Sequence, residues 1–241
     1  MSFSFLTFGS HDNYIGAVNR LVNQAKSLDL FHNIFSYTLD DLKNDSDFWS
    51  QHSSFILNNN RGCGYWIWKP YLIHKTLQSL NDGDYFLYLD SGSELLLTEK
   101  SSLLSYIEEY VNKYDLFASY FNSYATDINF NKMDLIHHFN IPTDSSLLFQ
   151  PQIQATFLFF KITPSIRTLI QNWLSFISNY HLFDDTPSVI PNFHYFIEHR
   201  HDQSVLSLLI KTSNLKPFII NEKYLSCIKL IRNRSSISKF I

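Results

Sequence analysis

The chain has 241 residues, of which 45% are hydrophobic and 17% are charged, and its formal net charge is −3. This balance is typical of a globular protein and excludes a disordered chain. A slightly acidic chain is also unlike a general nucleic-acid-binding protein, whose binding surface would be basic. We therefore expect no nucleic-acid partner.

The two cysteines, Cys63 and Cys227, match no metal-binding spacing and do not make a disulfide scaffold. The segment that begins the sequence, MSFSFLTFGS, lacks the basic and long apolar parts of a signal peptide. No apolar run approaches the 18 residues that a membrane-spanning helix needs. These features predict a cytoplasmic protein.

Apolar periodicity predicts alternating strands and helices along the first part of the chain. Short runs rich in aromatic and β-branched residues predict strands, and apolar residues at helical spacing predict helices. In chain order we expect strand 3–8, helix 17–28, strand 33–39, helix 71–80 and strand 84–90. Such alternation is the pattern of an α/β sheet.

The second part of the chain continues the same pattern. We expect helix 101–114, strand 115–121, strand 152–161, helix 165–180, helix 201–213 and strand 217–220. There is no internal repeat, biased linker or low-complexity tract. The sequence therefore predicts one α/β, Rossmann-like domain with a mixed, mainly parallel central sheet flanked by helices.

Acidic residues follow two of the predicted strands, where ligands of α/β proteins collect. Asp40 and Asp41 follow strand 33–39, and Asp90 ends strand 84–90 in the segment LYLDSGSE. An ionised carboxylate beside a core needs a partner, which could be a divalent cation bridging to a phosphate. The alternative is that Asp90 only caps a turn with its side chain.

The segment RGCGYWIWKP, residues 61–70, combines aromatic bulk with positive charge. Lys69 could bind a phosphate or a sugar hydroxyl, and Trp66 and Trp68 could form the apolar wall of a sugar site. The alternative is a packed aromatic corner with a lysine whose stem lies along it. From the residues alone the two interpretations are equally good.

The segment HRHDQS, residues 199–204, lies at the start of a predicted helix, where backbone N–H groups and the helix dipole favour anions. His199 or His201 could donate a proton or bind a metal, since imidazole titrates near neutral pH. In the simpler alternative, Asp202 only complements the first turn of its helix.

The end of the chain is basic, with five Lys or Arg residues and no acidic residue from Lys223 onward. It could contact the inner face of an anionic membrane. The alternative is a terminal helix with a solvated charged face.

Together these segments resemble the GT-A class of nucleotide-sugar glycosyltransferases. GYWIWKP, GDYFLYLDSG, QIQATFLFFK and HRHDQSVLSLL are similar to segments of small transferases from bacterial surface-polysaccharide loci and large algal viruses. The resemblance implies a nucleotide-binding part at about 1–95, an acceptor and catalytic part at about 96–215, and a basic tail at 216–241. It also implies a nucleotide-sugar donor and a glycan or lipid-linked acceptor.

The resemblance implies specific site residues as well. The residues implied to bind the donor are Thr7, Phe8, Gly9, Arg61, Lys69, Asp90, Ser91 and Gly92. Those implied to bind the acceptor are Trp66, Gln154 and His201, and the catalytic pair would be Asp202 and Gln203. Two positioned polar groups are expected beside an oxocarbenium-like transition state.

Asp90 would also hold Mn²⁺ or Mg²⁺, because it matches the first acidic residue of the family's Asp-x-Asp motif. Gly92 stands where the second acidic residue would be, and Glu94 is a possible substitute. We therefore expect a glycosyltransferase that retains anomeric configuration, with a non-catalytic carbohydrate-binding protein as the alternative. A nucleotidyltransferase is disfavoured, because no glycine-rich phosphate loop with a lysine follows the first strand.

Overall fold

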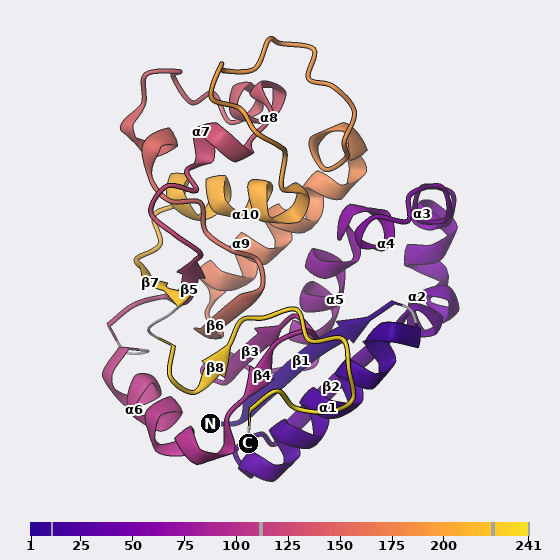
Figure 1. The fold of residues 1–241 in the computed structure, drawn as a ribbon, viewed down its shortest axis with the longest axis vertical. Coiled ribbons are helices and arrows are strands. Elements are labelled where there is room, and N and C mark those ends of the chain that lie inside the picture. The colour runs from indigo at the N-terminus through magenta and orange to yellow at the C-terminus, as the bar shows by residue number, and fades with distance from the viewer. Residues whose placement is uncertain (11, 111–112, 223–224, 241) are drawn as a thin grey trace.

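The structure is a computed structural model that describes residues 1–10, 12–110, 113–222 and 225–240. Its centre is a six-stranded sheet with the order β2-β1-β3-β6-β5-β7 (Figure 1). The strands are β1 (Phe3–Gly9), β2 (Asn33–Thr38), β3 (Tyr85–Leu89), β5 (Leu116–Tyr120), β6 (Phe157–Lys161) and β7 (Pro217–Asn221).

Strand β6 is antiparallel to both of its neighbours, while the other three pairings are parallel. The predicted mixed, mainly parallel sheet is therefore confirmed. The chain runs from β1 to β2 on one side and then crosses to β3 on the other. The carboxyl ends of β1 and β3 thus flank a topological switch point, where α/β sheets bind ligands.

The described residues form ten α-helices, which flank the sheet or lie beyond the ends of its strands (Figure 1). They are α1 (Asp12–Leu28), α2 (Leu39–Asn44), α3 (Ser46–Asn58), α4 (Gly62–Tyr65), α5 (Trp68–Leu77), α6 (Lys100–Tyr110), α7 (Asp127–Phe130), α8 (Met133–His138), α9 (Pro164–Ser175) and α10 (His201–Thr212). Every predicted helix up to residue 213 is present, although residues 111–112 of the one predicted at 101–114 lie outside the described residues. Helices α2, α3, α4, α7 and α8 were not predicted.

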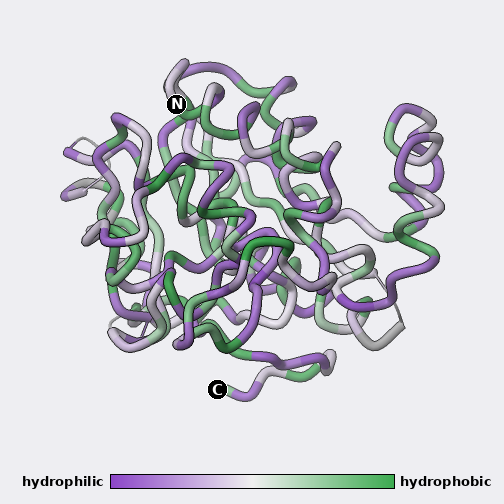
Figure 2. The backbone as a smooth tube through the Cα atoms, turned by 90° about the horizontal axis from the view of Figure 1, so that it is seen from above, coloured by the Kyte–Doolittle hydropathy of each residue, from purple (hydrophilic) through white to green (hydrophobic). Residues whose placement is uncertain are grey.

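Hydrophobic side chains fill both faces of the sheet, because successive residues of a strand point to opposite sides. In β3, Phe86 and Tyr88 belong to one core and Leu87 and Leu89 to the other. In Figure 2 apolar segments of the backbone accordingly run through the interior of the molecule, whereas hydrophilic segments dominate several of the outer loops. No helix of the described residues is long and apolar enough to cross a bilayer.

Asp40 and Asp41 lie at the start of α2 and serve local structure. The Thr38 side chain accepts a hydrogen bond from the backbone N–H of Asp41, and the Asp41 carboxylate accepts one from the backbone N–H of Thr38. This reciprocal capping box satisfies two free N–H groups of the helix. Asp40 pairs with Lys43 at the exposed surface. In this structure Asp41 thus caps α2, and Asp40 forms an ion pair within the same helix.

The basic end of the chain is not a terminal helix, so that expectation was wrong. After β7 the chain forms a short strand, β8 (Ile228–Lys229), which pairs antiparallel with β4 (Glu94–Leu95) in a second sheet. The described residues that follow β8 contain no helix. In Figure 1 this yellow segment crosses the strands near β4 and β1. Residues 223, 224 and 241 of the predicted basic tail lie outside the described residues.

Candidate active site

A fully buried lysine stands between two carboxylates at the carboxyl end of β3. The Lys69 ammonium lies 3.1 Å from Asp90 Oδ1 and 2.8 Å from Asp202 Oδ2. It also donates a hydrogen bond to the carbonyl of Ala155, at 3.2 Å. The structure therefore brings together three of the residues singled out by the sequence.

Each charged group of this cluster comes from a different element. Lys69 is in the first turn of α5, Asp90 directly follows β3, and Asp202 is in the first turn of α10. A helix N-terminus carries a partial positive charge, which favours the Asp202 carboxylate there. The site is thus built on rigid elements, which fix side chains better than loops do.

The cluster contains two carboxylates and one cation. Burial raises the pKa of Asp202, Lys69 lowers it and the neighbouring Asp90 carboxylate raises it, and the net result is a pKa of about 6. Burial lowers the pKa of Lys69, but Asp202 and Asp90 outweigh it and the pKa is raised overall. Lys69 therefore stays charged, and Asp202 gains a proton as the pH falls through about 6.

Tyr88 supports Asp90 from within the core. Its hydroxyl donates a 2.6 Å hydrogen bond to Asp90 Oδ1, and the Lys69 ammonium lies 5.3 Å from the centre of its ring. Burial raises the pKa of Tyr88 well above its ordinary value, and the charge of Asp90 adds to this. About a third of the Asp90 side chain is exposed, whereas Asp202 is almost fully buried. Asp90 is thus the more accessible of the two carboxylates.

The turn before Lys69 has an unusual backbone. Five successive residues have positive φ: Gly62 at 58°, Cys63 at 55°, Gly64 at 80°, Tyr65 at 52° and Trp66 at 61°. The backbone N–H of Tyr65 bonds the Arg61 carbonyl and that of Trp66 bonds the Gly62 carbonyl, at 2.8 and 3.1 Å. Residues 62–66 therefore form one turn of left-handed helix. Its three non-glycine residues cost about 1–2 kcal/mol each, and such strain is frequent at functional sites.

The left-handed turn gives a testable prediction. Gly64→Ala should lower the free energy of unfolding by about 1–2 kcal/mol through its positive φ. A new Cβ would also lie 2.8 Å from Ile56 Cγ1, which should add about 1–3 kcal/mol. Urea denaturation measures the loss. The control is Gly83→Ala, since Gly83 also has a positive φ, of 92°, but has no atom near a new Cβ. Equal losses in the two variants would contradict the packing role of the turn.

Trp66 and His201 pack against each other. Their ring centres lie 5.3 Å apart at 25°, and the ring of Tyr65 also contacts His201. His201 has a positive φ of 55°, and its Nδ1 lies 2.5 Å from the carbonyl of Phe183. Burial lowers the pKa of His201. This stack links the left-handed turn to the residue that precedes Asp202.

His199 is also held by the backbone. Its Nε2 lies 2.9 Å from the carbonyl of Leu182, and its Nδ1 accepts a hydrogen bond from the backbone N–H of Lys132. Burial lowers its pKa well below the ordinary value. Both ring nitrogens are engaged, so His199 is a structural residue in this arrangement.

Arg61 does not join Lys69. Its guanidinium bonds both oxygens of Asp185 at 2.9–3.0 Å and lies 3.6 Å from Glu198, on the exposed surface. The left-handed turn directs Arg61 and Lys69 to different acidic partners. Trp68 packs inward, with its ring stacked on Phe8 at 3.9 Å.

The glutamines near the cluster form their own hydrogen-bond chains. Gln203 Nε2 donates to Gln152 Oε1 at 2.7 Å. Gln154 accepts a hydrogen bond from Ser119 and donates one to Glu222. Gln154 directly precedes Ala155, whose carbonyl bonds Lys69. Gln154 and Gln203 are thus chain neighbours of two groups that Lys69 contacts, the Ala155 carbonyl and Asp202.

The end of β1 is tightly packed. Thr7 is fully buried and Phe8 is 4% exposed. A Cβ on Gly9 would lie 2.7 Å from Val18 Cγ2 and 3.0 Å from the Tyr14 carbonyl, so Gly9 is needed for the close approach of α1. Contact between these residues and a donor is still a prediction.

The residues after Asp90 are covered by the C-terminal segment. Ser91 is 4% exposed, and a Cβ on Gly92 would lie 2.9 Å from the carbonyl of Ile231. Glu94 is fully buried and accepts hydrogen bonds from Gln24, Asn233 and the backbone N–H of Lys239. Glu94 is therefore an anchor for the end of the chain rather than a free metal ligand.

These residues do not fit a closed divalent-metal site. Lys69 already lies between the Asp90 and Asp202 carboxylates, and Glu94 is engaged elsewhere. Within the described ranges no group of three or more His, Cys, Asp or Glu residues is placed to hold a metal. Asp90 alone offers an accessible carboxylate, so metal binding there would rest on one protein ligand.

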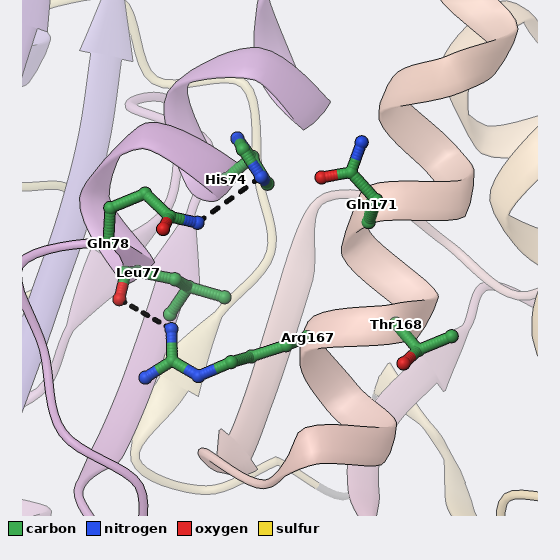
Figure 3. Close-up of a pocket in the computed structure, with 6 residues that line it drawn as sticks. All are labelled: His74, Leu77, Gln78, Arg167, Thr168 and Gln171. Atoms are coloured by element: carbon green, nitrogen blue, oxygen red, sulfur yellow. Dashed lines mark hydrogen bonds between the residues drawn. The ribbon is translucent and has the colours of Figure 1, made fainter.

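A cavity of about 250 Å³ lies away from this cluster, between α5 and α9 (Figure 3). Arg167 crosses it and bonds the carbonyls of Leu77 and Leu80, which precede β3. His74 and Gln78 contact each other on the α5 side. The cavity is therefore close to the amino end of β3, opposite Asp90, and its arginine is already committed to α5 and the turn after it.

Sequence reasoning missed the residues that complete the cluster. Tyr88 lies two residues before Asp90, and residues two apart along a strand point to the same face. This spacing was a usable signal in the sequence. The Ala155 carbonyl and the contacts of Arg20 with the C-terminal segment left no local signal, because they join residues far apart in the chain.

No protein-family model matches the chain, and no curated protein matches its sequence. Its fold matches a solved glycosyltransferase involved in glycosylation of the major capsid of PBCV-1. The TM-score is 0.51 at 11% identity, over 93% of this chain and 84% of that one. It also matches the galactosyltransferase LgtC, solved with donor and acceptor sugar analogues. There the TM-score is 0.51 at 13% identity, over 91% of this chain and 74% of that one. The chain thus has the GT-A-like fold that the sequence predicted.

Proposed function

We propose that the protein is a glycosyltransferase that moves a sugar from a nucleotide diphosphate to a glycan or lipid-linked acceptor. The observation that carries the proposal is the buried Lys69 between Asp90 and Asp202 at the carboxyl end of β3. Burying the charges of Lys69 and Asp202 is costly for a purely structural purpose. Perturbed pKa values at such a strand end are typical of functional sites.

In the reaction, the bond between the anomeric carbon and the donor's β-phosphate oxygen breaks. A new bond forms to an acceptor hydroxyl oxygen, and the hydroxyl proton leaves with a base or with the released diphosphate. Asp202 would stabilise the positive charge that develops on the sugar, with Gln203 beside it. We favour retention of configuration and a hexosyl donor, with Gln154, Trp66 and His201 on the acceptor side.

A panel of nucleotide sugars, with and without Mn²⁺, tests the proposal. Binding is followed by the shift in melting temperature, and catalysis by release of nucleoside diphosphate in the presence of candidate acceptors. We expect at least one nucleotide sugar to bind and to be turned over by the natural protein. Binding without release for every sugar would indicate the non-catalytic alternative, and no binding at all would refute the proposal. NMR coupling constants of the product decide between retention and inversion.

A further inference from the structure

The C-terminal strap, defined here as residues 227–240, lies against the segment that follows β3. The backbone N–H of Leu96 bonds the Cys227 carbonyl, β8 pairs with β4, and the N–H of Asn233 bonds the Gly92 carbonyl at 3.0 Å. The strap therefore runs antiparallel to residues 92–96 and reaches a point two residues from Asp90.

Two buried charged residues anchor the strap. The Arg20 guanidinium, on α1, donates to the carbonyls of Ser91 and Ser93 on one side and of Asn233 and Ser235 on the other. Glu94 accepts hydrogen bonds from the side chains of Asn233 and Ser238 and from the backbone N–H of Lys239, all in the strap. An arginine and a glutamate withdrawn from solvent in this way fix the path of the strap.

Two glycines leave room for the strap. A Cβ on Gly92 would lie 2.9 Å from the Ile231 carbonyl and 3.3 Å from the Cα of Arg232. A Cβ on Gly16, in α1, would lie 3.3 Å from the backbone N of Ser236. The strap therefore passes from the end of β3 to the start of α1, across the switch point between β1 and β3.

This path brings two exposed arginines to neighbouring strand ends. Arg232 lies against Gly92, after β3. Burial lowers the pKa of Arg200, two residues before Asp202, and the charge of Arg232 adds to this effect. The Arg234 guanidinium lies 5.0 Å from the ring centre of Tyr14, whose carbonyl borders Gly9 at the end of β1. Among the described residues, neither guanidinium has a hydrogen bond or an ion pair with another side chain.

We propose that Arg232 and Arg234 of the strap bind the diphosphate of the nucleotide sugar and do so without a divalent ion. This inference rests on the proposed function. Arginine's planar fork of N–H donors matches phosphate oxygens and is always charged. Glu94, the carboxylate that could have replaced the missing second acidic residue, instead holds the strap that carries these cations.

Equilibrium binding in EDTA tests the inference. UDP, GDP and ADP are the probes, with uridine, guanosine and adenosine for comparison, each titrated by calorimetry. The variants are Arg232→Gln, Arg234→Gln and the double variant. All three replace a charged side chain by a neutral polar one at exposed positions, so the fold should be unaffected. Lys216→Gln is the matched control, because it removes one exposed charge just before β7, at the amino-end edge of the sheet.

We expect the natural protein to bind at least one nucleoside diphosphate in EDTA. Each single variant should weaken that binding about tenfold and the double variant about a hundredfold, which is about 1.4 kcal/mol for each arginine. Nucleoside binding and the Lys216→Gln control should be unchanged. Added Mn²⁺ should change the affinity of the natural protein less than threefold.

Several results would overturn the inference. Unchanged diphosphate affinity in the double variant would overturn the inference and leave the proposed function intact. Diphosphate binding by the natural protein only in the presence of Mn²⁺ would have the same consequence. Failure of the natural protein to bind any of the diphosphates or any nucleotide sugar would overturn both. Sedimentation with vesicles of phosphatidylglycerol and phosphatidylcholine tests the second source of phosphate groups, the lipid headgroups of a membrane. Loss of vesicle binding with unchanged nucleotide binding would assign the arginines to a membrane surface instead.

Discussion

Replacing Lys69 with methionine should lower the free energy of unfolding by about 3–5 kcal/mol, the usual loss when one partner of a buried ion pair is removed. Methionine fills most of the volume of the lysine stem, so a cavity contributes little. The loss arises because Asp202, only 6% exposed, would be left beside the Asp90 carboxylate with no cation between them. Urea denaturation at pH 7 measures it, and turnover should be abolished.

Two further variants isolate the cause of this loss. Lys43→Met removes an exposed ion pair with Asp40 and should cost about 1 kcal/mol or less. The double variant Lys69→Met/Asp202→Asn should regain most of the stability, since the buried negative charge is gone, but not the activity. A loss in Lys69→Met no larger than in Lys43→Met would show that the cluster does not depend on its cation.

Asp202→Asn should lower kcat about 10²–10³-fold, the range seen when a group that stabilises transition-state charge is removed. Asparagine keeps the shape of the side chain, and Lys69 retains its 3.1 Å contact with Asp90. Donor binding should therefore change little, and the loss should appear in kcat more than in KM. Steady-state kinetics with the donor found in the panel measures both. An unchanged kcat would remove Asp202 from the catalytic machinery.

The pH dependence of stability provides a second test of Asp202. Burial raises its pKa to about 6, above the ordinary value of 3.8. A pKa raised on folding means that the native state binds the proton more tightly, so this contribution to stability is fully present below about pH 4. It is lost as the pH rises through about 6. The natural protein should show this decline, with a slope of up to about 1.4 kcal/mol per pH unit, and Asp202→Asn should lack it. Parallel profiles would contradict the raised pKa.

The sheet could be predicted because its strands are short apolar runs that bury both faces. Helices α2 and α3 were missed because polar residues interrupt the apolar pattern of LDDLKNDSDFWSQHSSFILN, and the middle residue of the buried face of α3 is His52. The capping signals were nevertheless present, since Thr38 and Asp41 form a capping box and Asp45 caps α3. Local hydrogen-bonding residues thus carried more information there than hydrophobic periodicity did.

The sequence singled out the three charged residues of the cluster but not their arrangement. Lys69, Asp90 and Asp202 stood out because each lies at a strand exit or a helix start. Their meeting depends on pairings between distant segments, which no local pattern records. Arg61 was placed with Lys69 because the two are close in sequence, yet the left-handed turn sends it to Asp185. Glu94 looked available only because its partners in the strap are far along the chain.

The left-handed turn also restricts changes in chain length at this point. Surface connections between secondary-structure elements usually accept insertions and deletions. Lys69, however, is the second residue of α5, directly after the turn. Adding or removing one residue in 62–66 would rotate the start of α5 by about 100° and shift it by about 1.5 Å along its axis. The ammonium would then leave its carboxylates, so in this fold the spacing between residues 61 and 69 is as constrained as the identity of Lys69.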